Sequence, residues 1–469
     1  MQAFLNNYSI RKGLHFYINI KNFDKLVAND EKDDDMSHMF HYLNTFLTSL
    51  ERYIRDNFDT NQVIVEKLTG SRIHIIVYGD CRKAFIYFLN ISNFAFKLSN
   101  FILTLSKYKT LTNIGIQIGA DFGVFNDLTF KDGEFEEYTS IGYPANFACK
   151  LQSIALSGEI LISKRIVDNI PPINGALITK LDYERQNQIL KKYPDSGNLV
   201  YAVSSSSRSI FYESLNKQLF FESLDNKRIN FEDYFELAKR LANKTDYQDM
   251  DTIEPHKMNF DKWNIKKSAK FNAAIVFADV RGFTKMFSPN GSNLSQMSRI
   301  TKDILATMYD KCASRSGVHV QFQGDREFVF FPENEIKNSI LFALELNLRV
   351  AAIFQGIAIG IGISVGKVYA TQIGLESEDD NFVKQNIMLG NTIKDANELE
   401  DLCAKEGEIT ISDKVYNHKF LIKEIRSLFS RRDYYWVSSS NFNDFIKLTL
   451  KSEEERNRSE NIYKPWNAV

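Results

Sequence analysis

The sequence predicts two similar α+β domains in tandem, each with a central sheet flanked by helices. The first observation is length, because 469 residues exceed what one ordinary hydrophobic core holds. The second is an internal repeat, in which segments of the first half return in the second half in the same order. The third is that strand-like runs such as RIHIIVY and EFVFF alternate with amphipathic stretches such as NSILFALELNLRVAAIF. This mixture of patterns is typical of the α+β class.

Four pairs of segments carry the repeat. GEILISKRIV (158–167) returns as GEITISDKVY (407–416), and IGADFGV returns as IGISVGKV. SIGYPANFACKL matches MLGNTIKDANEL, and VSSSS at Val203 matches VSSS at Val437. The spacing between partners changes only by loop-sized amounts, so the pattern indicates two domains rather than a solenoid of many short units.

The domain boundaries follow from this repeat. We expect a first domain over 1–205, a polar helical linker over 206–267, a second domain over 268–440 and a charged tail over 441–469. The linker assignment depends on the helical spacing of FEDYFELAKRLANK.

The composition argues against several classes of function. A net charge of −1 gives no global field that would attract nucleic acid or an anionic membrane. No apolar run is long enough to span a bilayer, and the first residues lack the apolar core of a signal peptide. The four scattered cysteines suggest neither a disulfide framework nor a zinc site. We therefore expect a cytoplasmic protein with no nucleic-acid and no membrane partner.

Two acidic residues of the second repeat stand at strand ends. Asp279 closes the apolar run AAIVFA, and Asp325 lies in VQFQGDREFVFF, which is typical of a hairpin. A carboxylate pair held by a sheet at the edge of a cleft suits hard divalent cations. Backbone N–H groups of the following turn, which includes Phe283 and Thr284, could cradle phosphates. Taken singly, Asp279 could merely cap a helix and Asp325 merely form a turn.

The combination of these segments resembles the class III nucleotidyl cyclases. F-A-D-x-x-G-F-T is followed 46 residues later by the aspartate of a hairpin G-D. IGISVGKVYATQIG, LGNTIKDANEL and GEITIS then follow in the order of that family. The resemblance covers both repeats and most of the chain. It implies two domains with central, mostly antiparallel sheets that pair head to tail as a pseudo-heterodimer and share active sites across the interface.

The resemblance also implies a metal site in the second domain. Asp279 and Asp325 match the ligands of two divalent ions, Mg²⁺ or Mn²⁺, and Val280 beside Asp279 is counted in the metal site. Lys367 matches a basic position that contacts phosphate. The positions that would read the nucleotide hold unsuitable residues, namely Gln321, Ile387, Lys394 and Glu398. A glutamate repels a triphosphate and an isoleucine cannot form a hydrogen bond with a base, so this domain lacks the half of the site that would read the nucleotide.

The first domain complements these losses. By the resemblance, Lys67 and Thr139 take the positions that read the base, and Asn146 takes the position that orients the ribose. Lys150 stands where the family usually has an arginine that acts on the transition state, so it keeps the charge but loses the bidentate fork. Taken singly, Lys67 could be an ordinary strand-edge lysine and Asn146 a helix-surface amide. As a set, they match what the second domain has lost.

The first domain has in turn lost the metal carboxylates. Asn19 in YINIKNFDK and Ser71 in LTGSR replace them, and this pair cannot hold two divalent ions well. The Gly79-Asp80 dipeptide follows a strand and aligns with no metal position, so we expect it to have no such role. The sequence therefore predicts one shared site with one half from each domain.

The resemblance implies a cyclase that converts a nucleoside triphosphate into a 3′,5′-cyclic nucleotide and pyrophosphate by two-metal catalysis. Lysine with threonine resembles adenylate cyclases, but cytosine and uracil also carry ring acceptors that a lysine could meet. A one-site tandem with no sensor, membrane or receiver segment resembles the pyrimidine cyclases of bacterial anti-phage (Pycsar-type) systems. We therefore predict a pyrimidine cyclase in anti-phage defence, making cyclic CMP or cyclic UMP for a separate effector.

Two alternatives stay open. One is an adenylate cyclase that makes cyclic AMP, although in tandem soluble adenylate cyclases the metal-binding domain usually comes first. The other is a catalytically inactive nucleotide-binding regulatory module. The sequence also leaves open whether the domains pair within one chain, as a monomer with an internal pseudo-dimer, or between chains as a homodimer.

Overall fold

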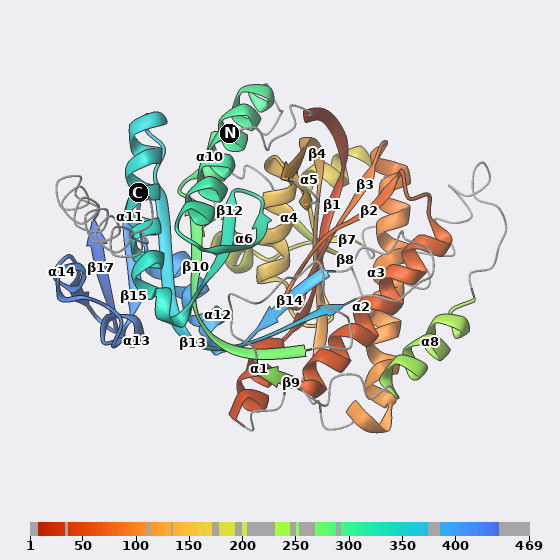
Figure 1. Ribbon diagram of the computed structural model, residues 1–469. Helices are drawn as coiled ribbons and strands as arrows, with labels where there is room; N and C mark the ends of the chain where they lie inside the picture. Colours follow the sequence, from red (N-terminus) through yellow and green to blue (C-terminus); the bar gives the residue numbers. More distant parts are fainter. Residues whose placement is uncertain are drawn as a thin grey trace, which may run out of the picture.

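The chain folds into two domains, each a mixed sheet flanked by helices (Figure 1), as the sequence predicted. The computed structural model describes residues 8–32, 36–108, 111, 114–132, 135–170, 178–192, 199–203, 230–243, 250–252, 268–287, 292–373 and 385–439. The charged tail expected over 441–469 lies outside the described residues.

The first domain begins with its central strand. Its strands are β1 (Tyr8–Lys21), β2 (Val63–Thr69), β3 (Arg72–Tyr78), β4 (Gly115–Asp132), β5 (Phe135–Ile141), β6 (Ile160–Ser163), β7 (Ile178–Lys180) and β8 (Val200–Val203). Its helices are α1 (Phe23–Lys32), α2 (Ser37–Asn57), α3 (Cys81–Thr104), α4 (Tyr143–Ile154), α5 (Lys164–Asn169) and α6 (Tyr183–Lys192), with a 3₁₀ turn at Ser106–Tyr108.

The second domain repeats this order. Its strands are β10 (Ser268–Val280), β11 (Val318–Gln323), β12 (Arg326–Pro332), β13 (Ile359–Ile373), β14 (Gln385–Leu389), β15 (Glu408–Ser412), β16 (Ser430–Arg432) and β17 (Tyr435–Ser439). Its helices are α9 (Phe283–Met286), α10 (Leu294–Ser314), α11 (Ile336–Ile353), α12 (Asn391–Glu398), α13 (Asp413–Tyr416) and α14 (Lys423–Arg426). A 3₁₀ turn lies at Glu333–Glu335 and a π-helical turn at Leu399–Cys403.

The two sheets have the same topology. The strand order is β2-β3-β1-β4-β6-β8-β7 in the first and β11-β12-β10-β13-β15-β17-β16 in the second. Within these two orders, β4 with β6 and β13 with β15 are parallel, whereas the other neighbours are antiparallel. Even the cap after the parallel strand repeats, since Ser163 accepts from the Ile166 N–H and Ser412 from the Val415 N–H. The sequence repeat is thus a repeat of structure.

A glycine in each long strand lets a helix lie directly on the sheet. A Cβ at Gly119 would collide with the backbone of α4 at Gln152, and one at Gly362 would collide with the chain after α12 at Glu400. These glycines are equivalent in the repeat, so α4 and α12 take the same position on their sheets.

The structure describes residues 230–243 and 250–252 of the predicted linker, and the first of these ranges contains a helix. Helix α8 (Glu232–Ala242) packs on α2 and α3 of the first domain, where Asn57 donates to the Tyr234 hydroxyl at 2.7 Å (Figure 1, right). The short strand β9 (Met250–Thr252) then pairs in parallel with β10. The connection therefore contacts both domains.

The domains contact each other reciprocally, as two subunits do around a two-fold axis. Helix α4 contacts α9 and α12 contacts α1, while β4 contacts α10 and β13 contacts α2. In the same way β5 contacts β11 and β14 contacts β2. Each domain also contributes apolar side chains to the hydrophobic core of the other. The first domain contributes Leu128, Phe130, Ile141 and Tyr143, and the second contributes Tyr369, Ile373, Ile387 and Leu389. Both hydrophobic cores therefore include residues from the two domains, so the domain pairing is part of how each core packs.

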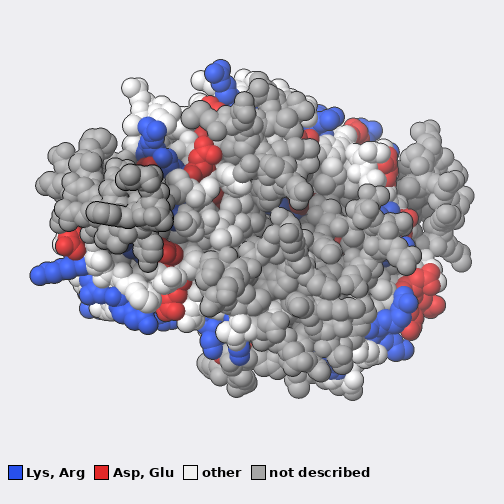
Figure 2. Space-filling model, viewed as in Figure 1, with Lys and Arg blue, Asp and Glu red and all other residues white. Residues whose placement is uncertain are grey.

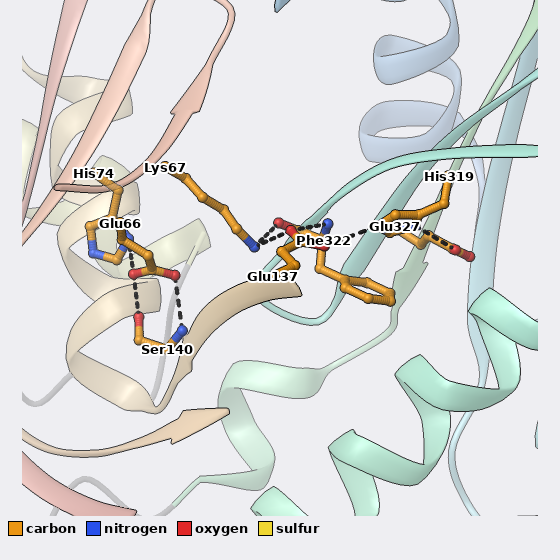
Figure 3. A network of polar contacts seen from close by, with 8 residues as sticks. All are labelled: Glu66, Lys67, His74, Glu137, Ser140, His319, Phe322 and Glu327. Carbon is orange, nitrogen blue, oxygen red and sulfur yellow. Dashed lines mark hydrogen bonds and ion pairs between the residues drawn. The ribbon is translucent and has the colours of Figure 1, made fainter. Parts of the chain in front are cut away.

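A buried polar network crosses this interface (Figure 3). Glu137 of β5 accepts from the Phe322 backbone N–H at 2.8 Å, and its other oxygen lies 2.9 Å from His319 Nε2. The second ring nitrogen of His319 lies 3.0 Å from Glu327. Burial alone would lower the pKa of His319, but the two carboxylates outweigh it and raise the pKa to about 9. A histidine cation between two buried carboxylates thus joins the domains.

The described residues on the face drawn in Figure 2 include side chains of both charge signs. Figure 2 shows basic and acidic side chains side by side on the described parts of one face, in keeping with a net charge of −1. Among the described helices, none combines the length and apolar character that a membrane crossing requires.

The stability of the fold should decrease as the pH rises and His319 loses its proton. The folded state raises the pKa of this residue from 6.5 to about 9, so its stabilisation is fully present below pH 6.5 and is lost as the pH rises through about 9. Such a shift corresponds to roughly 3 kcal/mol. We expect the difference in thermal unfolding midpoint between the wild type and His319→Gln, measured by circular dichroism, to shrink from about pH 6 to about pH 9.5.

His38→Gln provides the control for this measurement. The His38 ring bonds the Lys107 carbonyl, so its described partner lies within the first domain. This variant should keep the pH slope of the wild type. A difference between wild type and His319→Gln that stays constant over the same pH range would show that His319 carries no such charge.

Candidate active site

A cavity of about 800 Å³ lies between the domains, with walls from both. It gathers most of the residues that the sequence singled out. Those from the first domain are Lys67, Asn146 and Lys150, and those from the second are Asp279, Val280, Phe283 and Asp325.

Three predicted residues are not placed in this cavity by the described structure. Thr139 is fully buried on β5 with no partner for its hydroxyl, and the next residue, Ser140, lines the cavity instead. Lys367 is exposed on β13 and is not a lining residue. The side chain of Thr284 lies outside the described part of the chain.

The carboxylates of the second domain meet because a strand end faces a hairpin turn. Asp279 pairs across the sheet with Arg326, and Asp325 precedes that arginine in a turn where Gly324 has a φ of 74°. Burial raises the pKa of Asp325 well above its ordinary value, and the charge of Asp279 raises it further. Burial also raises the pKa of Asp279, although Arg326 and Arg281 oppose the shift.

These two carboxylates fit divalent cations that prefer oxygen ligands. Both lose hydration in the cavity, and the charge of Asp279 disfavours a second charge on Asp325. A cation between them would relieve both effects. The donor set of this structure therefore agrees with a metal site.

The opposite wall belongs to α4. Asn146 and Lys150 are four residues apart and therefore share one face of this helix. The Asn146 side-chain oxygen would lie 3.7 Å from a Cβ at Gly324, so it reaches the hairpin of the other domain, while its Nδ2 atom has no partner. Lys150 lowers the pKa of both aspartates, which places its charge near the pair.

A second cavity of about 450 Å³ occupies the pseudo-symmetric position. The residues that replace functional groups gather there, including Asn19, Ser71, Gln321, Ile387 and Lys394. The Ser71 hydroxyl donates to the Asn19 side-chain oxygen at 2.8 Å, so these two satisfy each other without a cation. Asp80, which the sequence set aside, caps α3 by accepting from the Arg82 N–H at 2.8 Å.

Glu400 was missed by the sequence argument. It lies on the π-helical turn after α12, where its carboxylate is 2.8 Å from Arg281 and 2.6 Å from Arg326. Arg281 also lies 3.5 Å from Asp279. Burial raises the pKa of Glu400 to about 7 even though Arg326 opposes the shift. The equivalent residue of the first domain is the neutral Gln152, so the charged arrangement accompanies the aspartate pair.

Glu66 was also missed, for a reason of strand geometry. A β-bulge between Val65 and Lys67 sets Glu66 and Lys67 together opposite His74, so both face the cavity. Strict alternation would have sent Glu66 to the other side of the sheet. Its neighbours in the cavity wall are Ser140, His74 and Tyr17. A bulge leaves no clear mark in a sequence, so no local signal pointed to Glu66.

Three solved structures match all or part of the chain. A class III adenylyl cyclase-like ATP-binding protein from Pseudomonas aeruginosa has a TM-score of 0.64 at 13% identity, covering 94% of this chain and 90% of that one. The adenylyl cyclase CyaB from P. aeruginosa matches with 18% identity over 37% of this chain and 97% of that one, at a TM-score of 0.30. The guanylate cyclase domain of RhGC from Catenaria anguillulae, in complex with GTP, matches with 19% identity over 37% and 99%, also at 0.30.

Of these three, the first spans both domains and supports the tandem fold of the whole chain. No curated protein sequence matches. Residues 265–445 match the family model of the adenylate and guanylate cyclase catalytic domain. The aspartate pair lies within this match, so the second domain is similar in sequence to that catalytic domain.

Proposed function

We propose that the cavity between the domains is one nucleotidyl cyclase site shared by both halves of a single chain. The observation that carries this proposal is that Asp279 and Asp325 of one domain face Asn146 and Lys150 of the other across one cavity. The reaction would form a bond from the ribose 3′-oxygen to the α-phosphorus. It would break the bond from that phosphorus to the leaving pyrophosphate.

Each residue would have a distinct part in this reaction. Asp279 and Asp325 would hold Mg²⁺ or Mn²⁺, with Val280 beside them, and bound cations would lower the pKa of the attacking hydroxyl and neutralise the triphosphate. Lys150 would oppose negative charge that develops at the α-phosphate. The unpaired Nδ2 of Asn146 would donate to the ribose and orient it for in-line attack.

We further propose a pyrimidine nucleoside triphosphate as the substrate, with cyclic CMP or cyclic UMP sensed by a separate effector in anti-phage defence. The support is the resemblance of this one-site tandem to the Pycsar-type cyclases. A further support is that the metal-binding domain comes second, unlike in the tandem soluble adenylate cyclases. Incubation with each of the four ribonucleoside triphosphates and Mn²⁺, followed by mass spectrometry, tests the base. Cyclic AMP as the sole product would reject it.

A second candidate is a nucleotide-binding module without turnover. The observation that favours it is the fold likeness to a Pseudomonas protein described as cyclase-like and ATP-binding. A likeness at 13% identity concerns the fold alone, so the residues of the cavity decide between the two. The retained pair of aspartates in the second domain supports turnover.

Asp279→Asn should abolish cyclisation while leaving the fold intact. The change removes a negative charge but keeps the shape of a half-buried side chain at the end of β10. We expect the rate of cyclic nucleotide formation to fall more than about 100-fold, because groups that only support a metal ligand already cost about 10- to 100-fold when lost. Cyclic product is measured by mass spectrometry and the fold by circular dichroism.

Asp80→Asn is the matched control. Asp80 also lies near a strand end, but it caps α3, and asparagine caps a helix as well as aspartate does. This variant should keep wild-type activity. Retained activity in Asp279→Asn would overturn the proposed site.

Glu400→Gln should weaken metal binding without preventing catalysis at saturating metal. Loss of the carboxylate leaves two guanidinium groups, Arg281 and Arg326, facing each other beside the aspartates, so their charge competes with the cation. We expect the Mn²⁺ concentration at half-saturation to rise about tenfold. Free Mn²⁺, measured by electron paramagnetic resonance, reports this binding independently of turnover.

Glu408→Gln is the control for Glu400→Gln. Glu408 forms the same kind of pair with Arg432, at 2.9 Å, outside the cavity lining. It should leave Mn²⁺ binding unchanged. Equal Mn²⁺ binding by Glu400→Gln and the wild type would show that Glu400 does not position the metal aspartates.

A further inference from the structure

A guanidinium without an acidic partner lies in the wall of the candidate active-site cavity. Arg72 of β3 is half-buried and lines this cavity. Its Nη1 donates to the Cys149 sulfur at 3.1 Å, whereas its buried Nε has no hydrogen-bond partner within the described residues. Sulfur is a weak acceptor, and among the residues that the structure describes no carboxylate lies within ion-pair distance of Arg72. The described protein groups therefore leave the charge of this side chain unpaired.

The repeat shows which partner Arg72 lacks. Arg72 and Arg326 are equivalent, since each directly follows its hairpin turn and pairs with the same position of its central strand. Arg326 lies 2.6 Å from Glu400, but the residue equivalent to Glu400 in the first domain is the neutral Gln152. A charged group that loses hydration without a partner of opposite charge costs free energy. An anionic ligand beside Arg72 would therefore be stabilised.

The guanidinium of Arg72 faces the candidate active-site cavity. Arg72 also lines the second cavity, but of the two cavities its partner Cys149 lines only the candidate active site. Cys149 directly precedes Lys150 on α4, so the guanidinium lies beside the helix that carries Lys150. Burial raises the pKa of Tyr17, while the charge of Arg72 lowers it and that of Asp325 raises it further. The charges of Arg72 and Asp325 thus act on the same hydroxyl in the cavity wall.

The phosphates of a nucleotide would need such a group. Lys367, which the sequence assigned to phosphate, is not a lining residue of this cavity. Lys150 lines the cavity, but an ammonium lacks the planar fork that binds two phosphate oxygens at once. A guanidinium has this fork, so Arg72 can supply it from a neighbouring strand.

We propose that Arg72 is a further substrate-binding residue of this site, and that its guanidinium binds the phosphates of the nucleoside triphosphate. This inference rests on the proposed cyclase function. Arg72 and Lys150 would approach the phosphates from β3 and α4 of the first domain, and the aspartate pair from the second. All four ribonucleoside triphosphates share the phosphate chain, so this contact would not depend on the base.

Inorganic tripolyphosphate is the probe for this contact, because it carries the phosphate chain without a base or a ribose. Calorimetric titration in the presence of Mg²⁺ gives its affinity, and circular dichroism checks the fold of each variant. Arg72→Gln should weaken the affinity at least about tenfold, since it removes hydrogen bonds from a charged donor. Arg72→Lys keeps the charge but loses the fork, so its affinity should lie between those of the wild type and Arg72→Gln. Arg72→Lys keeps the proposal testable even if Arg72→Gln does not fold.

Three control variants locate the bound anion. Of the two cavities, Lys150 lines only the candidate active site and Lys394 lines only the second cavity. Lys150→Gln should therefore weaken tripolyphosphate binding, and Lys394→Gln should keep the wild-type affinity. Arg11 lies 3.6 Å from Asp127 and lines neither cavity, so Arg11→Gln should bind as the wild type does and controls for the change in net charge.

The outcomes separate this inference from the proposed function. A wild type that does not bind tripolyphosphate, or an unchanged affinity in Arg72→Gln, would overturn the role of Arg72. A loss in Lys394→Gln as large as that in Arg72→Gln would place the anion in the second cavity and also overturn it. The expected losses without a cyclic product from any of the four triphosphates would support Arg72 and reject the cyclase activity. The same losses together with a cyclic product, and a raised KM in Arg72→Lys, would support both.

Discussion

The structure depends on one largely buried carboxylate at the domain interface, Glu137. It takes a hydrogen bond from the Phe322 backbone and lies within ion-pair distance of His319 in the other domain and of Lys67 in its own. A buried acid is costly unless its partners satisfy it, so the interface is stable in the arrangement that brings these partners together. The same contacts fix one wall of the cavity against the other. The geometry of the candidate site therefore depends on how the domains pair.

Pairing two similar domains creates two equivalent positions, and the chain uses them differently. One holds Asp279 and Asp325, with Glu400 and its two arginines behind them. The other holds Asn19 and Ser71, which bond to each other. A cluster of carboxylates raises its own pKa values and needs a cation, whereas an amide and a hydroxyl need none. Because the acids are confined to one position, Asn19 and Ser71 at the other satisfy each other without a cation.

The cavity wall that contains Glu66 shows how a small backbone irregularity changes the chemistry of a site. The bulge at Glu66 turns two successive side chains, the acidic Glu66 and the basic Lys67, to the same side of the sheet. The interface then engages Lys67, while Ser140 and His74 hold Glu66. The hydrogen-bonding groups available to a ligand are thus those that the contacts between the domains leave unused. The local sequence does not show which groups these are.

The sequence by itself determined the two-domain α+β fold, the repeat, and the division of residues between the halves. These depend on hydrophobic periodicity and on residue types at matching positions, which a chain carries locally. It also identified Asp279, Asp325, Asn146 and Lys150, which the structure brings to one cavity. Only the tertiary structure excluded Thr139 and Lys367 from that cavity and brought in Glu66 and Glu400. The reason is physical, because bulges, ion pairs between distant segments and the fit of two domains depend on contacts that no single stretch of chain specifies.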